Sequence, residues 1–330
     1  MRVLITGGAG YCGSRLACTL LAHGHEVIVY DIMWFGCALV RRPGLTVVSA
    51  DIRSTERFAR ACCGVDAVVH LACVSNDASF ELDEALSTSI NLDAFEPLVI
   101  AARDAGVKRF VYVSSSSVYG VSDAPDVRED HPLVPLTLYN KYKGMCEPLL
   151  FRHTSDDFAG VVLRPATVCG YSMRQRLDLS VNILTNHAVN TGVITVFGGS
   201  QMRPNLHIQD YCDAIELVLN APSESIQNEI FNVGYQNLSL MEIARLVRSV
   251  VCEEYPNMRS VQIELRPTND IRSYHINSDK IATRLGFVPK RTIEDAVCEL
   301  CVAFKAGKLP NSMNDDRYFN VARLKAIGAR

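Results

Sequence analysis

The first half of the chain alternates short apolar runs with longer segments of amphipathic or small residues. The apolar runs are rich in β-branched residues and show little alternation of polar and apolar positions, which is typical of strands buried on both faces. These runs occupy residues 2–6, 26–30, 45–49, 67–71, 110–114 and 160–163. Their order predicts a doubly wound α/β fold, in which helices cover both faces of a parallel sheet.

The pattern loosens after residue 165. Turn signals at residues 197–200 and 255–257 separate helical stretches at 239–252 and 292–305, which indicates a smaller α/β lobe. A chain of 330 residues is long enough for two lobes. We therefore predict a first domain of residues 1–170, joined by part of 206–236, and a second, substrate-binding lobe of residues 171–330.

Glycines follow the first predicted strand in the spacing of a phosphate-binding turn. Gly7, Gly10 and Gly13 fall three residues apart, just before a helix expected over residues 12–22. Glycine permits a tight turn and lets the backbone approach a pyrophosphate, whose charge the helix N-terminus stabilises. The order of strand, turn and helix predicts a Rossmann-like dinucleotide site.

The acidic residue that ends the second predicted strand indicates which dinucleotide, NAD or NADP, is bound. Asp31 lies roughly twenty residues beyond the turn, where a carboxylate binds the adenosine ribose hydroxyls and repels a 2′-phosphate. NAD is therefore expected rather than NADP. Arg41 and Arg42 are the counter-argument, although exposed, solvated arginines explain them as well. Asp51 and Ile52 are placed to border the adenine, and a helix-capping role for Asp51 is equally open.

A second group of residues carries acid/base chemistry. Tyr139 and Lys143 are four residues apart and share one face of a helix, where the amine is expected to lower the pKa of the phenol. This spacing often arises by chance, so the position of the Tyr-Lys pair relative to other polar residues matters. Serines at 114–117 end the fifth predicted strand, at the edge of the sheet where open α/β folds bind ligands. One of these hydroxyls is expected to hold the reacting oxygen.

Five motifs, in this order, resemble those of the extended short-chain dehydrogenases/reductases. The motifs are TGGAGYCG at residues 6–13, HLA at 70–72, SSSSVYG at 114–120, Tyr139-x-x-x-Lys143 and RPATVCG at 164–170. The resemblance extends over residues 1–305 and includes nucleotide-sugar 4-epimerases, 4-dehydrogenases and 4,6-dehydratases. It implies an NAD-dependent enzyme whose second lobe binds a nucleotide sugar.

The resemblance also implies particular site residues. Its catalytic residues fall on Ser115, Tyr139 and Lys143. With the motifs above, it places the cofactor at Gly7, Gly10, Tyr11, Cys12, Gly13, Asp31, Asp51, Ile52, Leu71, Ala72, Tyr139 and Lys143. It places the substrate at Ser115, Ser116, Asn182, Arg203, Arg266 and Arg272.

The three arginines of the second lobe are expected to bind the substrate diphosphate, since a guanidinium fork suits phosphate oxygens. Taken singly, each is more often a solvated surface charge. Residues 203–210 are similar to the family segment that supplies such an arginine, although Pro204 and Asn205 replace its usual Asp and aromatic residue. We assign His70 and His207 to structure.

Departures from the family narrow the reaction. Its dehydratases usually carry an Asp-Glu pair directly after the catalytic hydroxyl residue, where this chain has Ser116 and Ser117. Without these acids, elimination is disfavoured. The run RQRLDLSVN at 174–182 is similar to a branch in which some members stop at the 4-keto product. A 4-epimerase is therefore expected first, then a 4-dehydrogenase or 4-keto reductase. A non-catalytic NAD sensor or subunit is the alternative from another class, against which the intact Tyr139 and Lys143 argue.

Composition and charge exclude other classes. The net charge is −3 and no basic block appears, which argues against nucleic acid as a partner. The chain has no apolar stretch of membrane-spanning length and no export signal, and its twelve cysteines fit a reducing cytoplasm. Cys298 and Cys301 lack a second pair, so no metal is expected. Apolar helices around 91–105 and 139–153 suggest a homodimer through a four-helix contact.

Overall fold

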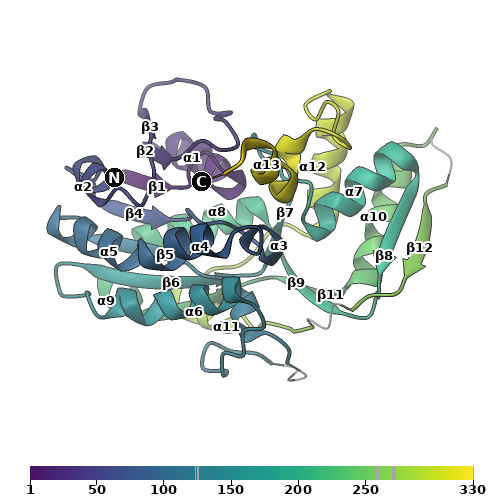
Figure 1. Cartoon of the computed structure of the whole chain (residues 1–330). Coiled ribbons are helices and arrows are strands. Elements are labelled where there is room, and N and C mark those ends of the chain that lie inside the picture. Colours follow the sequence, from purple (N-terminus) through teal and green to yellow (C-terminus); the bar gives the residue numbers. More distant parts are fainter. Residues whose placement is uncertain (123, 125, 258–259, 270–272, 330) are drawn as a thin grey trace.

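Seven parallel strands form the central sheet, in the order β10-β6-β5-β4-β1-β2-β3 (Figure 1). The computed structural model describes all residues except 123, 125, 258–259, 270–272 and 330. The strands are β1 (Arg2–Thr6), β2 (Glu26–Asp31), β3 (Leu45–Ser49), β4 (Ala67–His70), β5 (Arg109–Val113), β6 (Ala159–Pro165) and β10 (Glu229–Val233). The predicted doubly wound fold is confirmed, with strand ends within a residue or two of expectation.

Helices cover both faces of this sheet because its strands are apolar on both sides. Along β1, Val3 and Ile5 pack in one core, whereas Leu4 packs in the other, as the alternation of side chains along a strand requires. The first core includes α1 (Tyr11–Ala22) and α8 (Ile208–Asn220), and the second includes α2 (Thr55–Ala61), α5 (Phe95–Asp104) and α6 (Leu138–Phe151).

The helix expected over 91–105 is interrupted. A π-helical turn, Ser89–Asp93, follows the short α3 (Asp77–Phe80) and α4 (Glu84–Thr88), and α5 begins only after it. Pro97 lies in the first turn of α5, where the missing N–H is tolerated.

The second lobe has its own core, on the right of Figure 1. Parallel strands β8 (Val193–Phe197) and β12 (Gln262–Arg266) pack with α7 (Ser180–Thr191), α10 (Leu240–Glu254) and α12 (Ile293–Lys305). A sheet of β7 (Thr167–Cys169), β9 (Met202–His207) and β11 (Gln236–Ser239) lies where the lobes meet. Because β10 pairs with β6, part of 206–236 joins the first sheet; the exact domain limits stay a prediction. The remaining helices are α9 (Ser223–Ile226), α11 (Asp279–Leu285) and α13 (Asn320–Ile327).

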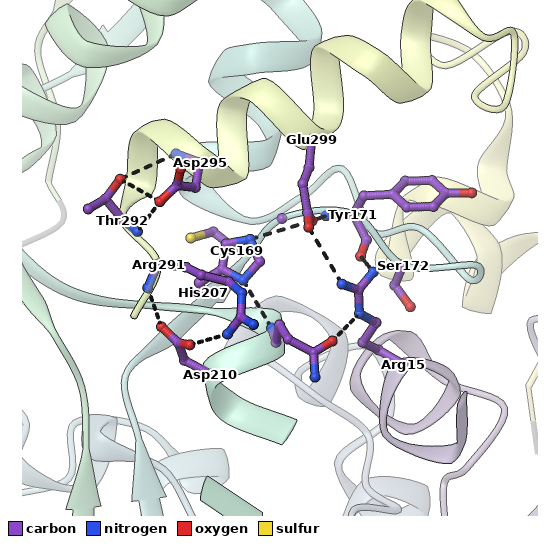
Figure 2. Close-up of polar contacts among 12 residues, drawn as sticks. Arg15, Cys169, Tyr171, Ser172, His207, Asp210, Arg291, Thr292, Asp295 and Glu299 are labelled. Atoms are coloured by element: carbon purple, nitrogen blue, oxygen red, sulfur yellow. Dashed lines mark hydrogen bonds and ion pairs between the residues drawn. The ribbon is translucent and has the colours of Figure 1, made fainter. Parts of the chain in front are cut away.

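A polar network ties the two lobes together behind the cavity described below (Figure 2). Glu299 on α12 accepts from the Tyr171 backbone N–H at 3.3 Å and lies 3.5 Å from Arg15 on α1. Its other contact is Nε2 of His207, at 3.4 Å. Nδ1 of His207 accepts from the Gln209 N–H, which leaves Nε2 as the ring nitrogen that faces Glu299. His207 is thus part of the junction.

All twelve cysteines of the chain are free thiols. Cys301 of α12 is buried in the core of the second lobe, and burial raises the pKa of this thiol to about 12. It therefore packs as a small apolar side chain. Within the described part of the chain, no helix has the length and hydropathy needed to span a membrane.

Candidate active site

A cavity of about 1010 Å³ opens between the lobes, at the carboxyl ends of the central strands. Every predicted cofactor residue lines it: Gly7, Gly10, Tyr11, Cys12, Gly13, Asp31, Asp51, Ile52, Leu71, Ala72, Tyr139 and Lys143. So do three of the predicted substrate residues, Ser115, Ser116 and Arg203. The cavity therefore joins the glycine turn to the acid/base residues in one space.

The glycine turn presents its backbone to the cavity. Gly7 has a φ of +68°, and a Cβ there would lie 2.8 Å from the backbone nitrogen of Ala72. A Cβ on Gly13 would collide with the carbonyl oxygen of Gly7. Gly10 has no other neighbour within 4 Å of its Cβ position than that carbonyl, at 3.1 Å, so this side of the turn is open. The three positions fit a tight turn, close helix packing and close approach of a phosphate.

The start of α1 offers hydrogen-bond donors. Ser14 is the first residue whose backbone N–H bonds back to the turn, at Gly10. The N–H groups of Tyr11, Cys12 and Gly13 have no partner among the described residues. Together with the helix dipole, these donors fit the pyrophosphate of a dinucleotide.

Asp31 ends β2 at the rim of the same cavity. Its Oδ2 accepts from the Ala9 N–H at 3.0 Å, and its Oδ1 accepts from the Met33 N–H at 2.8 Å. Burial raises the pKa of Asp31, and these two backbone N–H groups oppose the rise. Each carboxylate oxygen keeps a further lone pair for a ribose hydroxyl. The site therefore fits an adenosine ribose without a 2′-phosphate.

Asp51 does not cap α2, so the capping alternative is wrong. The N-cap residue of α2 is Ser54, and Asp51 pairs with Arg53, whose Nη2 lies 2.6 Å from Oδ2. Ile52 is buried and lines the cavity beside it. Arg41 and Arg42 are exposed, as a solvated surface position requires.

Tyr139 and Lys143 lie on successive turns of α6 and line the cavity together. Burial raises the pKa of Tyr139 well above its usual range, and Arg176 is the cation that opposes the rise. The expected lowering by Lys143 is not seen. Its Nζ donates to the carbonyl oxygen of Val113 at 2.8 Å, which holds the amine against the end of β5.

Ser115 stands at the turn after β5. It is the N-cap residue of a short 3₁₀ helix (Ser116–Tyr119), and its Oγ lies 2.7 Å from the Oγ of Ser117. Ser117 in turn donates to Oδ1 of Asn140, beside Tyr139 on α6. This chain of hydroxyls fixes Ser115 at the cavity wall. Ser116 is buried and also lines the wall.

Asn182 does not reach the cavity surface. It is fully buried, its Nδ2 donates to the Tyr11 hydroxyl and the Arg176 carbonyl, and its Oδ1 accepts from the Gly170 N–H. These contacts use both N–H groups of the side-chain amide and one lone pair of its oxygen. Asn182 therefore braces the wall instead of binding substrate.

The predicted substrate-binding arginines do not lie together. Arg203 of β9 lines the cavity, but Arg266 ends the outer strand β12 and is absent from the lining among the described residues. Its side chain is 60% exposed and pairs with Glu264 at 2.9 Å. Arg266 is thus a surface charge, and Arg272 lies outside the described residues.

The structure adds cavity residues that sequence reasoning left without a role. Arg174 and Arg176 are buried in the wall, and Asn320 reaches the same wall from the C-terminal segment. Nε of Arg176 donates to Asp178 at 2.6 Å, and its Nη1 donates to Ser75 at 3.2 Å. The run at 174–182 was the only signal for the arginines, and Asn320 lies beyond the resemblance.

These features define a dinucleotide-dependent enzyme site between a Rossmann lobe and a second lobe. The model of the NAD dependent epimerase/dehydratase family matches residues 3–234, and the chain belongs to this family. Its cofactor is NAD. The chain is therefore an NAD enzyme of the nucleotide-sugar epimerase/dehydratase class.

The relatives of the chain include enzymes named for different reactions. A UDP-glucose 4-epimerase of Lactobacillus helveticus is 28% identical, over 90% of this chain and 94% of its own length. A dTDP-glucose 4,6-dehydratase of Streptomyces niveus is also 28% identical, over 91% of each chain. The solved structure of MoeE5 with UDP-glucuronic acid and NAD is 25% identical, covers 93% of this chain and all of its own, and has a TM-score of 0.80.

Proposed function

We propose that the chain is an NAD-dependent nucleotide-sugar 4-epimerase. The observation that carries this proposal is that Ser115, Tyr139 and Lys143 line one cavity together with the glycine turn. Ser116 and Ser117 follow Ser115, where the dehydratases of the family carry acids. The similarity to UDP-glucose 4-epimerases supports the same reaction.

Acid/base catalysis falls to Tyr139 in this proposal. When bound, NAD accepts a hydride from carbon 4 of the sugar and supplies it again. Tyr139 removes the proton of the 4-hydroxyl as the hydride leaves, which gives a 4-keto sugar, and Ser115 hydrogen-bonds the same oxygen. After the ketone has turned within the cavity, Tyr139 would return the proton to the same oxygen as the sugar is reduced on its other face. The reaction is balanced, because no net oxidation occurs.

Lys143 contributes hydrogen-bond donors and a positive charge to the site. An ammonium group has three donors, of which one is used by Val113. The other two would hold the hydroxyls of a ribose of the bound cofactor. Because burial raises the pKa of Tyr139, its ionisation requires cations nearby, and Arg176 is one that the chain itself supplies.

A panel of nucleotide sugars tests the proposal, scored for product stereochemistry by NMR and for nicotinamide absorbance. A 4-epimer formed without net cofactor reduction supports it. A released ketone with stoichiometric reduction would instead establish the 4-dehydrogenase, and reduction of added 4-keto sugars would establish the reductase. NAD binding without turnover of any sugar would leave the sensor or subunit role.

We also propose a homodimer through the exposed sides of α5 and α6. Figure 1 shows the two helices on the same face of the sheet, and Met145 of α6 is among the exposed large apolar side chains. Light scattering at micromolar concentration should give twice the mass of one chain. A monomer under these conditions would contradict the proposal.

A further inference from the structure

The loop after β7 is fixed against the first turn of α1. Ser172 donates its hydroxyl to the Tyr11 carbonyl at 2.7 Å and lies 2.9 Å from the Ser14 hydroxyl. The backbone N–H of Arg174 donates to the same Ser14 hydroxyl at 3.4 Å. The second lobe therefore brings Arg174 beside the helix end whose backbone N–H groups face the cavity without partners.

Arg174 is a buried cation with unused donors. Arg174 is 7% exposed, and its guanidinium stacks on the Phe35 ring, 3.9 Å from the ring centroid. Nη2 donates to Oδ1 of Asn320 at 2.7 Å, but Nε is buried without a hydrogen-bond partner. No carboxylate of the described residues lies within ion-pair distance of Arg174. A guanidinium has five N–H donors, so this site lacks an acceptor.

The neighbouring charges show what is missing. Arg176 is paired with Asp178, whereas Arg174 has no such partner. Burial is the main cause and the charge of Arg176 the second of a lowering of the pKa of Arg174 to about 9. A buried cation without an anion is unfavourable. An anion bound at this wall would remove the cost.

We propose that Arg174 is a cofactor-binding residue, which contacts the pyrophosphate of NAD from the second lobe, across from the N-terminus of α1. The glycine turn and Arg174 then hold the two sides of one anion. A guanidinium fork matches phosphate oxygens in geometry and charge. Arg174 lies at the adenosine half of the cofactor site, because Phe35, on which it stacks, follows β2 and lines the cavity together with Asp31.

Asn320 acts as a positioning residue for this contact. Its Nδ2 donates to the Ser75 hydroxyl at 2.8 Å, and its backbone N–H donates to Asp178 at 2.9 Å. Figure 1 shows α13, which begins at Asn320, lying back against the first lobe after the chain has crossed from α12. The C-terminal segment thus fixes the guanidinium that closes the cofactor site.

Competition binding tests the proposal independently of turnover. ADP and adenosine are each used to displace NAD from the holoprotein, and UDP binding to the holoprotein is measured by calorimetry. Each measurement is made for the wild type and for Arg174→Met, which keeps an unbranched apolar side chain against Phe35. The affinity for ADP should fall about tenfold to a hundredfold, the effect of one charged hydrogen bond. Adenosine has no pyrophosphate, and UDP represents the diphosphate of the sugar substrate, so both should change by less than about twofold by the same reasoning.

Equal losses for adenosine and ADP, an unchanged ADP affinity, or a loss confined to UDP would each overturn the proposal. Arg323→Met is the matched control, since Arg323 lies on α13 and donates to the Trp34 carbonyl at 2.8 Å. If it weakens ADP equally, the effect belongs to the segment and not to Arg174. Should Arg174→Met fail to fold, Arg174→Lys keeps the charge without the fork. Its ADP loss must then exceed its adenosine loss, and equal losses again overturn the proposal.

Discussion

Glu147 of α6 and Arg164 of β6 form a buried ion pair. Nη2 of Arg164 lies 2.6 Å from Oε2 of Glu147, and each side chain is 3% exposed. Glu147 also accepts from the Ser114 hydroxyl at 2.7 Å. Because positions 139, 143 and 147 share one face of α6, this pair anchors Tyr139 and Lys143 to strands β5 and β6.

Replacement of Glu147 by leucine should reduce the free energy of unfolding by about 3–5 kcal/mol, because it leaves the Arg164 cation buried and unpaired. Urea unfolding measures this loss. Glu254→Leu is the control, since Glu254 pairs with Lys305 at the same distance of 2.6 Å but at a more exposed position. That change should cost no more than about 1 kcal/mol. Equal losses for the two variants would contradict the importance of burial.

Tyr139→Phe should reduce kcat by about 10²–10⁴-fold, because it removes the general acid/base and keeps the ring. NAD affinity should stay near that of the wild type. Tyr142→Phe is the matched control: Tyr142 lies on the same helix, packs its ring against Phe80, and does not line the cavity. Near-normal turnover of Tyr139→Phe would show that the roles proposed here are wrong.

Asp31 should make NAD bind more tightly than NADP, because its carboxylate repels a 2′-phosphate. Dissociation constants for the two cofactors, measured by calorimetry, provide the check. Asp31→Asn, which removes the charge and keeps the shape, should narrow the difference. Equal affinities in the wild type would count against the assignment of Asp31.

His70 makes stability depend on pH in a defined window. Its ring is buried between strands, with Nδ1 2.9 Å from the Thr6 hydroxyl, and burial lowers its pKa from 6.5 to about 3, with Lys143 adding to the effect. Between these values the unfolded chain binds the proton and the folded chain does not. Stability is therefore complete above the unfolded pKa and is lost as the pH falls.

His70→Gln should remove this dependence. As the pH falls from about 6 to 4, the free energy of unfolding should fall more steeply for the wild type than for the variant. The difference between the two slopes should be close to about 1.4 kcal/mol per pH unit, the effect of one proton. Urea unfolding at several pH values gives both slopes, and the difference between them isolates His70 from other titrating groups. Parallel slopes would mean that His70 is protonated in the folded protein or is accessible to water.

Local patterns carried most of what could be predicted. The strands, the glycine turn and the four-residue spacing of Tyr139 and Lys143 depend on residues near one another in sequence, and the structure has them as expected. The prediction of a lowered pKa for Tyr139 is wrong because burial, the largest influence on this pKa, raises it, and burial follows from the whole fold. Spacing alone does not provide that quantity.

Contacts between distant segments could not be read from the sequence. Asn182 belongs to a recognised run, but its partner Tyr11 lies 171 residues away, so this buried contact was not foreseeable from the sequence. Arg266 fell at a position matched to the family, yet it ends an outer strand and faces solvent. Arg174 and Asn320 meet across 146 residues, and this contact gave no local signal.

The position of Asn320 predicts how slowly the cofactor leaves. Its side chain joins Ser75 of the first lobe to Arg174 of the second, so these two hydrogen bonds must break before the C-terminal segment can move from the cofactor site.

Asn320→Ala removes both hydrogen bonds, at a cost of roughly 1–2 kcal/mol, and should speed NAD dissociation about five- to thirtyfold. Exchange of labelled NAD from the holoprotein measures the rate. Asn314→Ala is the control, because Asn314 is in the same segment and, among the described residues, its side-chain amide bonds with Asn311 alone, at an exposed position. An epimerase retains its cofactor through each cycle, whereas a dehydrogenase must exchange it, so slow wild-type release that depends on Asn320 would also favour the epimerase. An unchanged rate in Asn320→Ala would show that the segment does not hold the cofactor.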